Sequence, residues 1–269
     1  MIEAIIKYSH RLKRIPKRLR YVISSASGAI ILFIAVGVPY QQAWLMLILL
    51  IIAGYALTWF ALLEDIKGIE WGTLFILPVI WTACWYLTFY MVPMRLLTRL
   101  VFSVMYPAVL YVIISAMNIF NVGVGRSIQL HRAAQAANYF VIVLVYYLVT
   151  RVILSFSMPC LVTGLLLGVV TFIVSIQHYW TLSPSVTISV QSVRMSAFQA
   201  LAMTYLMILM SLLPFATESP LPIIVTGVYY VLSSLFAALG DEVLLERRLR
   251  EFILVIIILA LATLFTLHW

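Results

Sequence analysis

Residues 43–63 read AWLMLILLIIAGYALTWFALL, a run without a charged side chain. A helix rises about 1.5 Å per residue, so this stretch is long enough to cross the roughly 30 Å hydrocarbon core of a bilayer. The whole chain of 269 residues is 65% hydrophobic and 10% charged, with a mean hydropathy of +1.12. A soluble domain carries about a quarter charged residues. The sequence therefore predicts a polytopic membrane protein.

Apolar runs of similar length recur at close intervals along the chain. They predict an all-α transmembrane bundle of about nine helices, spanning 21–38, 43–63, 71–93, 100–120, 139–157, 160–176, 195–213, 221–240 and 252–268. The connection at 157–159 is short, so eight spans are the alternative. Residues 181–194 alternate apolar and polar side chains in part and are expected to form an interfacial or protein-packed loop, because a lone strand cannot lie exposed in lipid.

The positive charges indicate how the chain is oriented. Residues 1–20 form a basic, weakly amphipathic leader, and residues 21–269 form a single membrane domain. The cations of the leader are Lys7, Arg11, Lys13, Arg14, Lys17, Arg18 and Arg20. With a cytoplasmic amino terminus and nine spans, fourteen of the 17 Lys and Arg fall on the inner side and two in outer loops. This bias predicts a cell-membrane protein whose inner face meets anionic headgroups and whose carboxyl terminus lies outside.

Two other interpretations of the basic residues were weighed. A secretory signal peptide is one, with Ala35-Val36-Gly37 as its cleavage site. We favour an uncleaved segment, because the next span begins a few residues later. Nucleic-acid binding is the other, and we do not expect it, because the cations lie in short clusters between apolar spans.

Two ten-residue segments resemble each other at an offset of 144 residues. Residues 77–86 read LPVIWTACWY and residues 221–230 read LPIIVTGVYY. Extended along the chain, the offset predicts an inverted repeat of four spans, one connecting span and four spans, the layout of many transporters. A chance match between two aromatic-rich helices is the alternative.

The most polar stretch inside the apolar sequence is 118–138, which reads NIFNVGVGRSIQLHRAAQAAN. Its candidate ligand- or headgroup-binding residues are Asn118, Asn121, Arg126, Gln129, His131 and Arg132. The polar positions from Arg126 to Asn138 recur every third residue, which steps around a helix by about 60° each time and so does not form one binding face. We therefore expect a polar collar that contacts headgroups or helix ends, where the chain leaves the bilayer after Asn118 and re-enters near Tyr139.

A second candidate site lies on the predicted outer side. Arg95 and Arg99 lie in an outer loop, and Arg151 lies inside a span, close enough to its outer end for the side chain to reach the interface. The three arginines are a candidate anion site. Interfacial anchoring with an ion pair to Glu218 is the alternative.

The remaining polar residues give little sign of chemistry. Every carboxylate lies in a loop or at a span end, at Glu3, Glu64, Asp65, Glu70, Glu218, Asp241, Glu242, Glu246 and Glu251. This placement argues against proton coupling through a mid-membrane acid. We expect no catalytic residue, metal site or cofactor.

The sequence alone favours a non-enzymatic protein that transports a solute or handles lipids. A scaffold subunit of an envelope complex is the first alternative. An integral enzyme acting on a phospholipid or lipid-linked phosphate is the second. Neither the substrate nor the oligomeric state follows from the residues.

Overall fold

The computed structural model describes residues 15–63, 66–92, 96–122, 128–212 and 221–241, together with 253 and 257. Over this part of the chain the structure is helical and contains no strand. Eight of its helices are long and apolar enough to cross a membrane. The predicted polytopic helical bundle is confirmed. The leader up to residue 14 lies outside the described residues. Of the ninth predicted span, 252–268, only residues 253 and 257 are described.

The helices follow one another with short connections. They are α2 (Lys17–Val36), the 3-10 turn η1 (Tyr40–Gln42), α3 (Ala43–Leu62), α4 (Glu70–Phe89), α5 (Leu96–Val122), α6 (Ile128–Ser155), α7 (Cys160–Leu182), α8 (Val190–Ser211) and α9 (Leu221–Asp241). The short connection near 157–159 does separate two helices, α6 and α7. Each predicted span from the first to the eighth corresponds to one of these helices.

Three predicted boundaries are wrong. Helix α2 begins at Lys17, so the last basic residues of the predicted leader belong to a helix. Helix α6 begins at Ile128, well before the start of the predicted span at 139–157, so the second half of the polar collar belongs to the same helix as that span. Helix α7 continues to Leu182 and α8 begins at Val190, which leaves only 183–189 outside helices where a long loop was expected.

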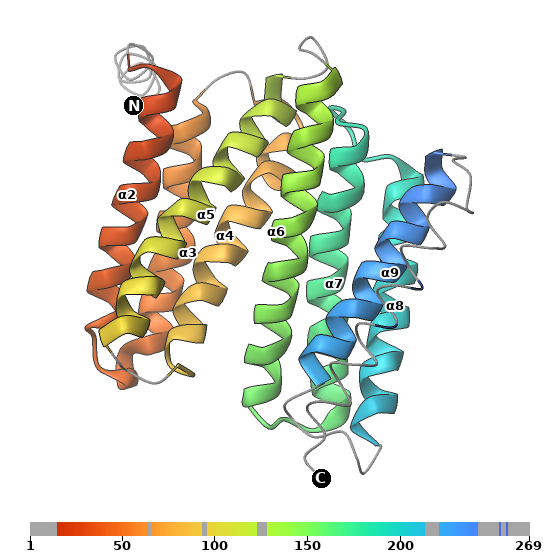
Figure 1. The fold of residues 1–269 in the computed structure, drawn as a ribbon. Helices are drawn as coiled ribbons and strands as arrows, with labels where there is room; N and C mark the ends of the chain where they lie inside the picture. Colours follow the sequence, from red (N-terminus) through yellow and green to blue (C-terminus); the bar gives the residue numbers. More distant parts are fainter. Residues whose placement is uncertain are drawn as a thin grey trace. The chain divides into compact units, whose positions relative to one another are not determined.

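The chain divides into two compact units, residues 1–141 and 142–269 (Figure 1). In unit 1, α2 packs along α3 and α5, and α4 packs against α3 and α5. In unit 2, α7 packs along α8, and α9 packs against both. Helix α6 runs through the boundary, so its first half belongs to unit 1 and its second half to unit 2.

Close helix contacts in unit 1 depend on small and hydroxyl residues. A Cβ on Gly28 of α2 would lie 3.1 Å from the hydroxyl of Tyr106 and 3.2 Å from Leu110, both on α5. On the same helix, the buried hydroxyl of Ser24 donates to the carbonyl of Leu57 in α3. Small residues let helix backbones approach in the absence of a hydrophobic driving force between them, as expected within a bilayer.

The outward faces of the helices are strongly apolar. Phe33 of α2 is 75% exposed, and Leu201 and Tyr205 of α8 are each 70% exposed. Exposed side chains of this kind suit contact with lipid rather than water.

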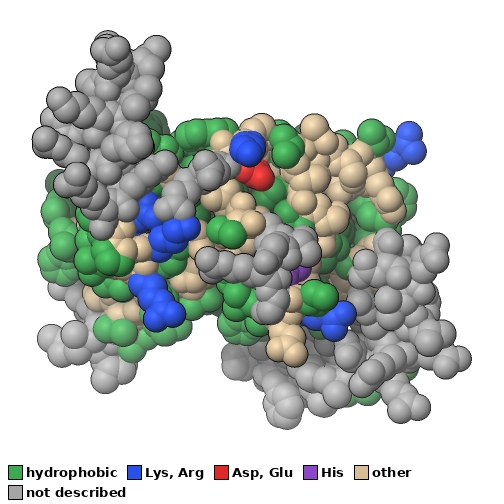
Figure 2. Space-filling view, turned by 90° about the horizontal axis from the view of Figure 1, so that it is seen from above, with side chains coloured by type: hydrophobic (Ala, Val, Ile, Leu, Met, Phe, Trp, Pro, Cys, Tyr) green, Lys and Arg blue, Asp and Glu red, His purple; other side chains and the backbone are tan. Residues whose placement is uncertain are grey.

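One end of unit 1 gathers positive charge. The first turns of α2 carry Lys17, Arg18 and Arg20, and the α3–α4 connection carries Lys67. Figure 2 looks onto this end and shows Lys and Arg side chains among hydrophobic and other uncharged ones, with an acidic side chain beside one of the basic ones. Arg20 differs from its neighbours because its side chain is almost completely buried, at 1% exposure. The end at which α2 begins is therefore the basic end of unit 1.

Candidate functional site

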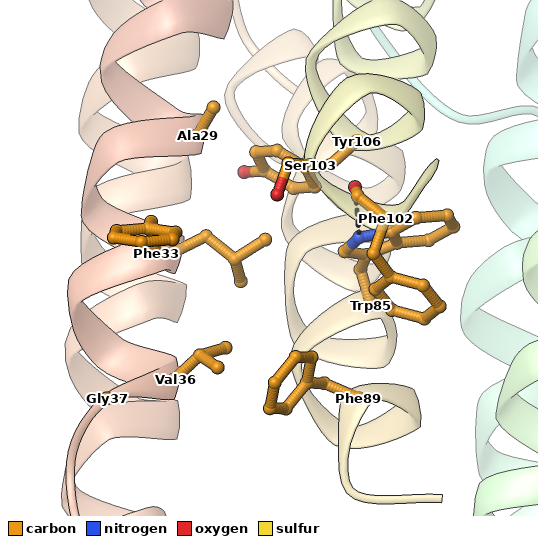
Figure 3. Close-up of a pocket in the computed structure, with 10 residues that line it drawn as sticks. Ala29, Phe33, Val36, Gly37, Trp85, Phe89, Phe102, Ser103 and Tyr106 are labelled. Atoms are coloured by element: carbon orange, nitrogen blue, oxygen red, sulfur yellow. Dashed lines mark hydrogen bonds between the residues drawn. The ribbon is translucent and has the colours of Figure 1, made fainter. Parts of the chain in front are cut away.

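A pocket lies inside unit 1, at the end away from the basic residues (Figure 3). Its volume is about 200 Å³. Three helices and one capping residue form it: α2 contributes Ala29, Leu32, Phe33 and Val36, its C-cap is Gly37, α4 contributes Trp85 and Phe89, and α5 contributes Phe102, Ser103 and Tyr106. No Lys, Arg, Asp, Glu or His lines it among the described residues. The pocket is therefore an apolar space with two hydroxyl groups at its edges.

Aromatic rings build the wall opposite α2. The ring centroids of Trp85 and Phe102 lie 4.4 Å apart, and those of Phe89 and Phe102 lie 6.2 Å apart. Behind this wall, Trp81 packs on Trp85 at 4.6 Å. Tilted and edge-on aromatic pairs of this kind add stability beyond the apolar area that they bury. The wall is thus a preformed surface, held from both α4 and α5.

Hydrogen bonds remove most of the polarity of this wall. The indole nitrogen of Trp85 donates to the carbonyl of Phe102 at 3.3 Å, and that of Trp81 donates to the carbonyl of Tyr106, also at 3.3 Å. Pro107 lies inside α5, directly after Tyr106, and lacks the N–H that would normally bond the carbonyl of Ser103. The carbonyl that Pro107 leaves without this bond, that of Ser103, lies in the sequence between the two carbonyls that the indoles bond.

The inner edge of the pocket is closed where α2 meets α5. The hydroxyl of Tyr106 lies 3.1 Å from the hydroxyl oxygen of Thr82, which itself lies 2.9 Å from the carbonyl of Pro78. Because the hydroxyls of Tyr106 and Thr82 bond each other, the inner edge offers little polarity to a ligand. At this edge α2 and α5 are in close contact, since a Cβ on Gly28 would lie 3.1 Å from the hydroxyl of Tyr106.

The opposite edge of the pocket is open. Three residues that line the pocket are exposed on the surface: Phe33, Gly37 and Ser103. Leu32, which also lines the pocket, is buried. Phe33 is flanked on α2 by Ile30 and Ile34, which are 62% and 63% exposed. The pocket therefore opens on an apolar helix surface of the kind that meets lipid.

The sequence-predicted residues of 118–138 lie near the other end of unit 1. Asn118 is buried in α5, and His131 of α6 contacts Phe120 with ring centroids 5.5 Å apart and lies 3.1 Å from the side-chain nitrogen of Gln135. Asn121 is partly buried, Gln129 and Arg132 are exposed, and Arg126 lies outside the described residues. The structure thus brings His131 beside the end of α5, and none of the described residues of this set lines the pocket.

The predicted outer anion site is described only in part. Arg151 lies one turn before the end of α6 and its side chain is exposed. Arg95 and the side chain of Arg99 lie outside the described part of the chain. The grouping of the three arginines stays a prediction.

Of the three carboxylates at positions 64, 65 and 70, Glu70 has a structural role. Its carboxylate accepts the backbone N–H of Lys67 at 2.7 Å, in the first turn of α4, where a negative charge is favourable. In the described part of the chain, no three His, Cys, Asp or Glu side chains gather in a way that could hold a metal ion.

Sequence reasoning did not find the pocket, although a signal was present. Trp81, Trp85 and Phe89 recur every fourth residue, and Phe102 and Tyr106 share the same spacing, so each set lies on one face of its helix. Such spacing identifies a face but not the helix that it meets. No family model, curated protein or solved structure matches this chain.

Proposed function

We propose that the protein is a lipid-handling protein of the cell membrane, and that the pocket of unit 1 binds a hydrocarbon chain of a bilayer lipid. The observation that carries this proposal is the lining: eight of its ten residues are apolar, and the pocket opens where Phe33 of α2 and Ser103 of α5 are exposed. A charged or strongly polar ligand would leave its own groups without partners there, at a large cost in free energy.

The size of the pocket fits part of a lipid rather than a whole one. An apolar cavity of about 150 Å³ in another protein accommodates a benzene molecule. The pocket, at about 200 Å³, therefore suits several methylene groups of a chain. The headgroup would remain outside, close to the membrane surface.

The charge distribution supports one orientation of unit 1 in the membrane. The basic end of unit 1 carries Lys17, Arg18, Arg20 and Lys67, which favour the cytoplasmic side. The pocket lies toward the other ends of α2 and α4, near Gly37 and Phe89. We propose that it takes its chain from the outer leaflet.

The test uses a phospholipid whose acyl chain carries a terminal diazirine, mixed into vesicles that contain the purified protein. After irradiation, we expect labelling to concentrate on peptides that contain Phe33, Phe89 and Phe102. Val36→Trp puts an indole into the pocket and should lower labelling at Phe89 several-fold, because the two side chains face each other across it (Figure 3).

The matched control is Ile34→Trp. Ile34 is on the same helix, is 63% exposed and does not line the pocket, so this variant should label like the original protein. Unfolding midpoints in detergent show whether both variants fold. Labelling spread evenly over exposed helix faces, or a Val36→Trp variant that labels unchanged, would contradict the proposal.

A further inference from the structure

The interior of unit 2 contains a polar network that joins four helices. Its members are Tyr146 of α6, Thr171 and Tyr179 of α7, Gln199 of α8 and Tyr229 of α9, all at most 3% exposed. We call these five residues the unit 2 network. Buried polar groups are costly within a bilayer unless they are hydrogen-bonded, so their concentration in one place needs a physical reason.

The contacts of the network run from helix to helix. The hydroxyl of Tyr146 lies 2.8 Å from that of Thr171, and the ring of Tyr146 stacks on the ring of Tyr229 with centroids 4.0 Å apart. The hydroxyl of Tyr179 donates to the side-chain oxygen of Gln199 at 2.5 Å, and the side-chain nitrogen of Gln199 donates to the carbonyl of Tyr229 at 3.4 Å. The network therefore links α6, α7, α8 and α9.

Ser175 lies on the same face of α7 as two members of this network. Thr171, Ser175 and Tyr179 are four residues apart on α7 and so share one helix face. The two outer members of this series bond across to α6 and α8, and Ser175 between them is 0% exposed. Its hydroxyl thus points from a face of α7 that is packed against the other helices of unit 2.

The hydroxyl of Ser175 has no hydrogen-bond partner among the described residues. Other buried hydroxyls of the unit bond the carbonyl four residues earlier, as Thr150 does to Tyr146, Thr171 to Leu167 and Ser196 to Ser192. Ser175 does not make this bond. Thr226, one turn before Tyr229 on α9, has a buried hydroxyl that is likewise without a partner in the described part of the chain.

We propose that Ser175 marks an internal hydration site, at which water binds inside the membrane-spanning core of unit 2. A buried hydroxyl without a partner destabilises a protein, and a water molecule with two to four polar neighbours removes that cost. Thr171 and Tyr179 lie one turn before and one turn after Ser175 on the same face of α7, and their hydroxyl groups can both donate to water and accept from it. The network carries no formal charge, so the site favours an uncharged ligand. This proposal is independent of the pocket in unit 1.

The first experiment measures access of an aqueous reagent. Ser175→Cys is nearly isosteric and is made in a protein in which Cys84 and Cys160 are replaced by alanine. A small, water-soluble methanethiosulfonate should modify Ser175→Cys at least tenfold faster than the control Val174→Cys. Val174 is the adjacent residue and is equally buried, but it is apolar.

The second experiment measures the sign of a stability change. Ser175→Ala should lower the unfolding midpoint by about 2–4 °C, because bound water would lose a partner. Ser196→Ala is the control, since the hydroxyl of Ser196 is equally buried but bonds the carbonyl of Ser192. The proposal is supported when both results hold. It is overturned if Ser175→Cys reacts no faster than Val174→Cys, or if Ser175→Ala raises the midpoint as expected for a dry, unpaired hydroxyl.

Discussion

At Gly168 of α7, the side chain of Thr204 on α8 occupies the space that a Cβ would need. A Cβ there would lie 2.0 Å from the hydroxyl oxygen of Thr204 and 3.5 Å from the carbonyl of Ala200. One turn earlier, a Cβ on Gly164 would lie 2.7 Å from Ile208. The spacing Gly164-x-x-x-Gly168 indicates close helix packing, and the structure places that packing inside unit 2, against α8.

Gly168→Ala should therefore destabilise the protein. We expect a net loss of about 1–2 kcal/mol in the free energy of unfolding, since the overlap with Thr204 outweighs the better helix propensity of alanine. Unfolding in detergent measures it. Thr204→Ala, which removes the overlapping oxygen, should restore most of the loss in the double variant.

Gly72→Ala is the matched control for that prediction. Nothing lies within 4 Å of a Cβ at Gly72, in the first turn of α4, so this variant should be at least as stable as the original protein. A Gly168→Ala variant that behaves like Gly72→Ala would show that α7 and α8 can separate at no cost.

At the scale of the elements, the bond between α6 and α7 is the clearest pairwise contact to measure. The hydroxyls of Tyr146 and Thr171 lie 2.8 Å apart, and both side chains are fully buried. In a cycle of Tyr146→Phe, Thr171→Val and the double variant, we expect a coupling free energy of about 0.6 kcal/mol, the average for hydrogen bonds between membrane helices. Tyr146→Phe keeps the stack on Tyr229, so the cycle isolates the hydroxyl.

Tyr147 supplies the control on the same helix. It has no hydrogen bond among the described residues and is only partly buried, so Tyr147→Phe should leave the free energy of unfolding unchanged. A coupling indistinguishable from zero between Tyr146 and Thr171 would mean that this pair does not stabilise α6 against α7.

The sequence predicted the helices better than their ends. Hydropathy locates the part of a helix that lies in hydrocarbon, and it located α3 almost residue for residue. It placed the start of α6 too late, because Gln129, His131 and Arg132 are polar yet compatible with a helix. It ended α7 too early, because Gln177 and His178 are polar but buried against protein rather than exposed to lipid.

The pocket of unit 1 was harder to predict than the fold. Its wall needs Trp85 of α4 to meet Phe102 of α5, and which helices become neighbours is a tertiary property that no local spacing contains. The residues of 118–138 were predicted as a binding site because they are polar in an apolar chain. An apolar ligand, however, selects residues that do not stand out by composition.

At the scale of the whole molecule, the 144-residue offset relates the helices of the two units. It pairs α2 with α7, α3 with α8 and α4 with α9, and within each unit these three helices contact one another. In the matching ten-residue segments, Leu77 and Leu221 are both buried, as are Thr82 and Thr226. These parallels support an internal repeat, whose inverted orientation stays a prediction.

The orientation of the repeat can be tested with two residues that the offset relates closely. Gln41 lies in the α2–α3 connection and Val186 in the α7–α8 connection, and both are exposed. Five membrane-spanning helices, α3 to α7, separate them, so an odd number of crossings must put them on opposite sides of the membrane. The positive charges of α2 predict that Gln41 is outside.

In intact cells producing a protein without Cys84 and Cys160, a membrane-impermeant maleimide should label Gln41→Cys. Val186→Cys should react only after the membrane is permeabilised. Ile69→Cys, in the α3–α4 connection, should behave like Val186→Cys, because one helix, α3, separates it from Gln41. If Val186→Cys reacted in intact cells and Gln41→Cys only after permeabilisation, the repeat would still be inverted, but the whole protein would have the opposite orientation in the membrane. Labelling of Gln41→Cys and Val186→Cys from the same side would mean that one of the five helices does not cross, and the inverted repeat would then be wrong.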